Sequence, residues 1–111
     1  MANAYKILGQ LAPVANTLST LYTVPASRSA VISSINICNQ STTSAQDVRI
    51  AIVPSGATVN SYHYVAYGLP IPYSDSINLA LGLTMAANDS IQVYANNTTS
   101  VSFAAFGLEI Y

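Results

Sequence analysis

Hydrophobic and polar side chains alternate with a period of two along most of the chain, which is the pattern of half-buried β-strands. The clearest run is 75–83, where Ile77, Leu79, Leu81 and Leu83 alternate with small or polar residues. No segment has the three-to-four-residue spacing that is typical of an amphipathic helix. The pattern predicts eight strands, at residues 6–11, 17–24, 29–39, 47–53, 62–69, 75–83, 91–94 and 101–111.

Turn-forming residues separate these runs. Pro13, Pro25, the Pro-Ser-Gly of 54–56 and the Asn-Asp of 88–89 each interrupt the alternation. Eight short strands joined in this way predict an all-β protein, a single antiparallel β-sandwich or jelly roll, with a small closed barrel as the competing architecture. A chain of 111 residues is enough for one domain. We expect residues 1–15 to form an N-terminal arm or first strand and residues 16–111 to form the sandwich.

The composition is unusually poor in charge. Charged residues make up 6% of the chain, against a typical ~25%, and the net charge is -1. Three scattered cations cannot neutralise a run of phosphates, so we expect no nucleic-acid partner. No apolar run reaches the ~18 residues of a membrane helix, and the start of the chain lacks the pattern of a secretory signal, so we expect no membrane partner.

Residues that could carry out catalysis are few. His63 is the only histidine, so a two-histidine metal site is impossible, and we expect this residue at a surface or an interface. Cys38 is the only cysteine and is expected to be a buried, unreactive side chain. Asp75 and Asp89 could form a carboxylate pair, but both follow turn-forming residues, which favours a role in capping turns. We therefore expect no enzymatic activity, no metal and no cofactor.

Tyrosine is the most distinctive residue type. There are eight tyrosines, and Tyr62, Tyr64, Tyr67 and Tyr73 fall close together in the sequence. Such a cluster can be ordinary half-buried strand residues, a protein interface or a platform for sugars, since tyrosine has a flat apolar face and a polar tip. Strict alternation over 62–69 puts Tyr62, Tyr64 and Ala66 on the face opposite His63, Val65 and Tyr67.

A surface with little charge also favours association. Ser, Thr, Asn and Ala occupy the polar positions of the predicted strands, and neutral groups of this kind are buried at lower cost than charges. Lysine is almost absent from the strands, so the sheet edges lack the usual protection against pairing with another chain. These features predict a homo-oligomer, which we expect to be a trimer within a larger assembly.

Several segments, taken in order, resemble a known family. They are the run Leu-Tyr-Thr-Val-Pro-Ala-Ser-Arg-Ser-Ala-Val-Ile-Ser-Ser-Ile-Asn-Ile-Cys-Asn at 21–39, Arg-Ile-Ala-Ile-Val-Pro at 49–54, His-Tyr at 63–64, Leu-Gly-Leu-Thr-Met-Ala at 81–86, Val-Tyr-Ala at 93–95, Val-Ser-Phe at 101–103 and Phe-Gly-Leu-Glu-Ile at 106–110. Together they resemble small structural proteins of tailed bacteriophages, especially phages of cyanobacteria. The family usually has glycine where Ser27 stands, which leaves the turn type after Pro25 open.

The resemblance implies a virion component without enzymatic activity, assembled in the host cytoplasm. We expect a capsid decoration (cement) protein that stabilises contacts between major capsid subunits. A neck, tail, baseplate or fibre component is the first alternative, with other virion proteins as partners. A carbohydrate-binding β-sandwich module for host attachment is the second alternative, based on the tyrosines.

The expected contact residues are apolar or aromatic and lie in two segments. An extended arm could add a strand to a neighbour's sheet, and clustered tyrosines fit protein interfaces. The residues are Tyr5, Ile7, Leu8 and Leu11 in the arm, and Tyr62, Tyr64 and Tyr67 in the sheet.

Overall fold

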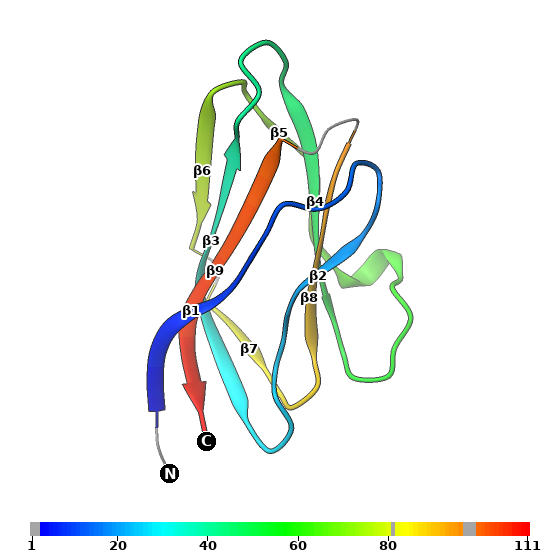
Figure 1. The fold of residues 1–111 in the computed structure, drawn as a ribbon. Helices are drawn as coiled ribbons and strands as arrows, with labels where there is room; N and C mark the ends of the chain where they lie inside the picture. Colours follow the sequence, from blue (N-terminus) through cyan, green and yellow to red (C-terminus); the bar gives the residue numbers. More distant parts are fainter. Residues whose placement is uncertain (1–2, 81, 97–99) are drawn as a thin grey trace.

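Two antiparallel sheets pack face to face in the computed structural model, which describes residues 3–80, 82–96 and 100–111 (Figure 1). This arrangement confirms the predicted antiparallel β-sandwich. Within the described ranges the only helical element is a short 3-10 helix, Ser61–His63.

Each sheet has a central pair of strands and two edges. Sheet A has the order β1-β9-β3-β6, and β7 also pairs with β3. Its strands are β1 (Asn3–Leu11), β9 (Val101–Ile110), β3 (Ser29–Asn39), β6 (Asp75–Leu79) and β7 (Leu83–Met85). Sheet B has the order β2-β8-β4-β5. Its strands are β2 (Ser19–Thr23), β8 (Ser90–Ala95), β4 (Gln46–Val53) and β5 (Tyr64–Ile71).

The described residues form nine strands, one more than the sequence predicts, because the run 75–83 is divided. β6 ends at Leu79 and β7 begins at Leu83, and Gly82 between them has a φ of 58°. A left-handed backbone of this kind cannot continue a strand and suits glycine best. Leu81, which the sequence places in the apolar row of this run, lies outside the described residues.

β5 also differs from its predicted bounds. The structure starts this strand at Tyr64, after the 3-10 helix, and continues it through Pro70 to Ile71. Because β5 is an edge strand of sheet B, it can contain a proline, which has no N–H to donate to a neighbouring strand.

The core lies between the sheets and is formed by alternate residues of both. Its fully buried side chains are almost all aliphatic, with Phe103 of β9 the largest. The strands β3 and β4 contain the most β-branched residues, and their inward rows are Ala30, Ile32, Ile35 and Ile37 in β3 and Val48, Ile50 and Ile52 in β4. Burying branched aliphatic residues from two facing sheets is the main force that holds this fold together.

The N-terminal segment forms a strand of the sandwich from Asn3 to Leu11, and residues 12–15 follow it without strand structure. β1 pairs with β9 from Asn3 to Leu11, with a register shift between Ile7 and Gly9. At that shift β1 comes close to sheet B, because a Cβ on Gly9 would lie 2.3 Å from the carbonyl oxygen of Leu21. Glycine is therefore required where the two sheets meet at this edge.

The sequence left open the type of the turn after Pro25, which precedes β3. Ser27 has a φ of 66°, in the left-handed region that glycine adopts most easily, and Arg28 N–H donates to the carbonyl of Pro25. This turn places Arg28 beside the end of β9, with its guanidinium 4.0 Å from the centre of the Tyr111 ring.

Candidate functional site

The expected contact residues of the N-terminal segment divide between two faces of β1. Tyr5 and Ile7 project from sheet A and are 84% and 54% exposed. Leu8 and Leu11 pack against the hydrophobic core instead. Only the first pair is therefore placed for contact with another molecule.

Tyr5 and Ile7 belong to a continuous apolar area on the outer side of sheet A. Across the β1–β9 pairing Ile7 lies opposite Phe106 and Tyr5 opposite Leu108, and across β3–β9 Val31 also lies opposite Leu108. We call this area the apolar face; its residues are Tyr5, Ile7, Val31, Phe106, Leu108 and Ile110. A cluster of large apolar side chains on one exposed sheet face is typical of an interaction surface.

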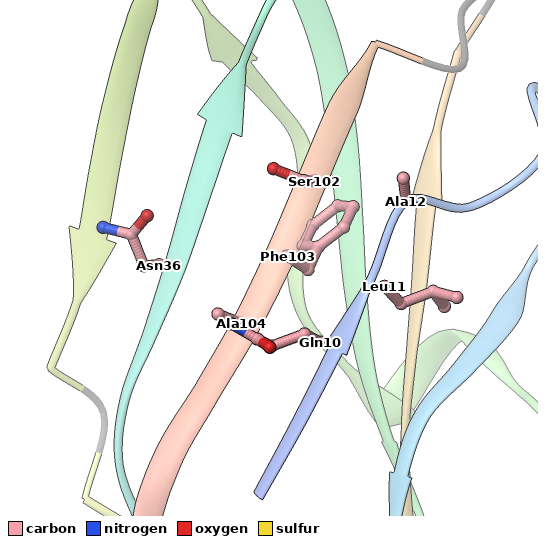
Figure 2. A pocket seen from close by; sticks show the side chains of 7 residues that line it. All are labelled: Gln10, Leu11, Ala12, Asn36, Ser102, Phe103 and Ala104. Atoms are coloured by element: carbon pink, nitrogen blue, oxygen red, sulfur yellow. The ribbon is translucent and has the colours of Figure 1, made fainter. Parts of the chain in front are cut away.

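The other end of the same sheet face is polar and slightly hollowed. A depression of about 330 Å³ lies over β1, β9 and β3, and Figure 2 shows the small or amide side chains around it. They include Gln10, Asn36, Ser102 and Ala104. Sheet A thus has an outer surface that is apolar at one end and neutral and hydrophilic at the other.

A buried carboxylate lies on the inner side of the apolar face. Glu109 is only 1% exposed, and it accepts a hydrogen bond from the Tyr22 hydroxyl of β2. Its other oxygen, Oε1, lies 2.7 Å from Lys6 Nζ of β1 and 3.1 Å from an Arg28 nitrogen. Glu109 therefore connects the edge strand β1, the turn before β3 and the opposite sheet.

The partners of Glu109 determine its ionisation. Burial alone would raise the pKa of its carboxyl, but the hydrogen bonds from Lys6, Tyr22 and Arg28 outweigh this and hold the pKa below its usual range. The pKa of the Tyr22 hydroxyl is raised, first by burial and then by donation to Glu109. The cluster is therefore stable as an ionised carboxylate with a protonated tyrosine.

The sequence analysis missed this cluster. Its four members are spread from residue 6 to residue 109, and an isolated glutamate in an alternating strand is normally assigned to the solvent side. The sequence does contain one signal for burial, since Glu109 lies in the same alternating row of β9 as the apolar residues Val101, Phe103 and Ala105. The structure buries this row.

The predicted sheet tyrosines form a second surface, on the outer side of sheet B. The Arg49 guanidinium of β4 lies between two rings, 4.2 Å from the centre of Tyr67 and 4.4 Å from that of Tyr94. Tyr67 also meets Tyr64 edge to face, with ring centres 5.0 Å apart. The Tyr94 hydroxyl donates to the side chain of Asn16.

The expected alternation over 62–69 was wrong at this point, since Tyr64 and Tyr67 lie together. Arg49 pairs with Tyr67 and Ala51 with Tyr64, so one more residue separates the two partners on β5 than on β4. This β-bulge reverses the alternation and puts both rings on one face.

Tyr62 and His63 are neighbours that differ in exposure. Tyr62 is 79% exposed and stands edge-on against the His63 ring, with centres 4.6 Å apart. His63 is buried, and its Nδ1 accepts a hydrogen bond from Asn60 N–H, so the expectation of a surface or interface histidine was wrong. The ring is held inside the 3-10 turn because it completes the hydrogen bonding of that turn.

The carboxylates of Asp75 and Asp89 do not meet in a catalytic pair. Asp89 caps a turn, as the sequence predicts, whereas Asp75 is the first residue of β6 and bonds to the residue next to it. Asp75 accepts from Ser76 N–H, and Asp89 accepts from the N–H groups of Ala86 and Ser55. Cys38 is a free thiol that is only partly buried, so its predicted full burial was wrong. Among the described residues no three histidine, cysteine or acidic side chains are grouped as metal ligands.

The described part of the chain contains no helix long and apolar enough to cross a membrane. Neither a scan against models of protein families nor a search of curated proteins finds a match for this chain. The resemblance to phage structural proteins therefore stays a prediction, and the two surfaces provide the structural basis for a function.

Proposed function

We propose that this protein is a non-enzymatic structural component of a tailed-phage virion and that it serves as a capsid decoration (cement) protein. In this role it would stabilise contacts between major capsid subunits. The apolar face is the observation on which the proposal chiefly depends. It exposes Tyr5 and Ile7 beside the half-buried side chains of Phe106, Leu108 and Ile110.

The intramolecular contacts of the charged side chains support a role in which the protein is in contact with neighbouring molecules. Lys6 and Arg28 pair with the buried Glu109, and Arg49 lies between two tyrosine rings. Every lysine and arginine side chain is thus engaged within the molecule. With few charges available to repel a neighbour, contact with neutral or apolar surfaces carries a small desolvation cost.

Features of the strand edges support contact through a sheet face over pairing of strand edges. Register shifts occur in the edge strands β1, β2 and β5, and Pro70 lies in β5. Bulges and proline are devices that discourage edge-to-edge pairing. Residues 3–11 are already part of sheet A, so donating them to a neighbour would break the β1–β9 pairing. We therefore favour contact through the apolar face over strand addition, in a homotrimer that binds the capsid.

Copy number in purified particles tests the proposal. Quantitative mass spectrometry should find on the order of hundreds of copies per virion, because many weak contacts act together in a decoration layer. A few to a few tens of copies would instead favour a neck, tail, baseplate or fibre component. Absence of the protein from purified particles would contradict both.

The second candidate function is a carbohydrate-binding module, which the exposed tyrosine cluster on sheet B favours. This candidate does not require the protein to be part of a virion.

A further inference from the structure

We propose that the groove beside Tyr64 and Tyr67 is a binding site for a neutral oligosaccharide. This site lies on sheet B, away from the apolar face of sheet A, and the inference does not depend on where the protein acts.

The groove is formed where the chain leaves β4, makes the 3-10 turn and returns as β5. Its volume is about 560 Å³, within the roughly 300–1,000 Å³ of small-ligand sites. Two aromatic rings come from the strand, and small polar groups come from the loop. The lining residues are Val59, Asn60, Ser61, Tyr64 and Tyr67.

Tyr67 combines wide exposure with fixed geometry. Its side chain is 64% exposed, yet its ring is held by the Arg49 guanidinium and by the edge-to-face contact with Tyr64. A ring that is already fixed loses little side-chain entropy when a ligand stacks on it. The β-bulge that brings Tyr64 and Tyr67 to one face is a local irregularity of a kind that often redirects side chains at functional sites.

The chemistry of the lining points to an uncharged ligand. None of the five lining side chains carries a charge, and Arg49, which contacts Tyr67, is already stacked between two rings. The groove therefore offers no unengaged cation for an anionic ligand and no carboxylate for a cationic one. It offers tyrosine hydroxyls, the Asn60 amide and the Ser61 hydroxyl, which can donate and accept hydrogen bonds.

An oligosaccharide fits these properties better than other neutral ligands do. One face of a pyranose ring is a patch of C–H groups that packs on the negative face of an aromatic ring, while its hydroxyls need polar partners around the rim. Asn60, Ser61 and Tyr67 are exposed, so the groove is open to water. A purely apolar ligand would remain largely hydrated there, whereas a hydroxylated ligand would keep its outer groups in water.

Titration followed by NMR tests the site directly. The folded, isotope-labelled protein is titrated with short gluco-, manno- and galacto-oligosaccharides, with oligogalacturonate as an acidic counterpart and a proline-rich peptide as a different class of ligand. We expect saturable shifts at the amides of Val59, Asn60, Ser61, Tyr64 and Tyr67 with at least one neutral sugar. The acidic sugar and the peptide should bind at least about tenfold more weakly.

Matched tyrosine variants test whether sugar binding depends on the groove or on exposed tyrosines in general. Tyr67→Ala should weaken binding about tenfold or more, and Tyr67→Phe, which retains the ring, should bind within about threefold of the parent. Tyr73→Ala removes another exposed tyrosine that does not line the groove and should leave binding unchanged. The NMR spectrum of each variant also reports whether it is folded.

Several results would overturn the proposal. These are the absence of shifts with every neutral sugar, shifts confined to residues outside the groove, tighter binding of the acidic sugar or the peptide, or a folded Tyr67→Ala variant that binds normally. None of these results bears on copy number in virions, so the cement proposal and this one fail independently, whereas the second candidate function, a carbohydrate-binding module, rests on this site and would fail with it.

Discussion

The two sheets use their positive charges in different ways. In sheet A, Lys6 reaches inward from the edge strand and, with Arg28, neutralises the buried Glu109. In sheet B, Arg49 stays on the outer side and lies between the rings of Tyr67 and Tyr94. The first arrangement leaves an outer surface of apolar side chains, and the second fixes aromatic side chains on the surface.

The comparison shows how a chain with so few charges can build two different surfaces. A carboxylate in the interior requires strong compensation, so the sheet A cluster contributes mainly to stability and fixes β1 in place. Cation–π contacts at an exposed site contribute less and mainly orient the rings. We therefore expect substitutions in the two clusters to have effects of different size and on different properties of the protein.

The largest effect is expected for Glu109→Ala. The change leaves the buried Tyr22 hydroxyl without its acceptor and opens a cavity, and it removes the shared partner of Lys6 and Arg28. We expect the free energy of unfolding, measured by urea denaturation, to fall by about 3 kcal/mol. A loss no larger than that of Arg49→Ala would contradict the assigned difference between the clusters.

Acid should weaken the same cluster. The pKa of Glu109 is lower in the folded protein than its usual value, so its contribution to stability is fully present above the usual glutamate range and is lost as pH falls through the folded pKa. Unfolding free energy measured against pH should decline below about pH 4.

Glu109→Gln should flatten that decline, because glutamine cannot be protonated in this range. The matched control is Asp47→Asn, which removes an exposed carboxylate outside the Glu109 cluster, and the decline that comes from Glu109 should persist in this variant. An identical pH profile for Glu109→Gln and the parent would show that Glu109 does not titrate as inferred.

A smaller effect is expected for Arg49→Ala. Losing the two ring contacts should reduce the free energy of unfolding by about 1 kcal/mol and should allow the Tyr67 and Tyr94 rings to move. Calorimetry measures the first change and aromatic NMR line shapes the second. Arg49→Lys retains the charge without the planar group, so an effect as large as that of alanine would indicate that the stacked guanidinium is essential.

The smallest change in stability is expected on the apolar face. Leu108→Asn replaces a half-buried outward side chain, so unfolding free energy should change by only about 0.5–1 kcal/mol. If the face is a contact between copies, however, sedimentation should show loss of the trimer. Val14→Asn changes an exposed apolar residue outside the face and should leave sedimentation unaffected. A parent protein that is a stable monomer at low concentration would contradict the proposed trimer.

The strands β9 and β5 show how much of the structure the local sequence pattern could predict. In β9 the alternation correctly predicts a strand, but both rows contain apolar residues, so the pattern alone does not select the inward row. The structure buries the row of Phe103 and Glu109 and leaves the row of Phe106 and Leu108 half-buried on the outer side of the sheet. Partners on β1, β2 and the turn before β3 make the buried carboxylate tolerable, and none of them is near in sequence.

In β5 the tyrosines were visible in the sequence, but their joint position was not. Alternation assigns Tyr64 and Tyr67 to opposite faces, and a bulge against β4 brings them together. A bulge depends on how two strands pair, which a single strand's pattern does not contain.

The sequence by itself determined that this chain is all-β with turns at Gly, Pro, Asn and Asp, because strand alternation and turn preference are properties of neighbouring residues. The choice between the sandwich and a closed barrel came from the pairing of the strands into two sheets. Only the tertiary structure decided that Glu109 lies inside, that Phe106 and Leu108 lie outside, and that Arg49 holds a pair of tyrosine rings. These outcomes depend on register and on contacts between residues far apart in the chain. Their energies depend on burial and on the distance between charges, and both are set only when the two sheets come together.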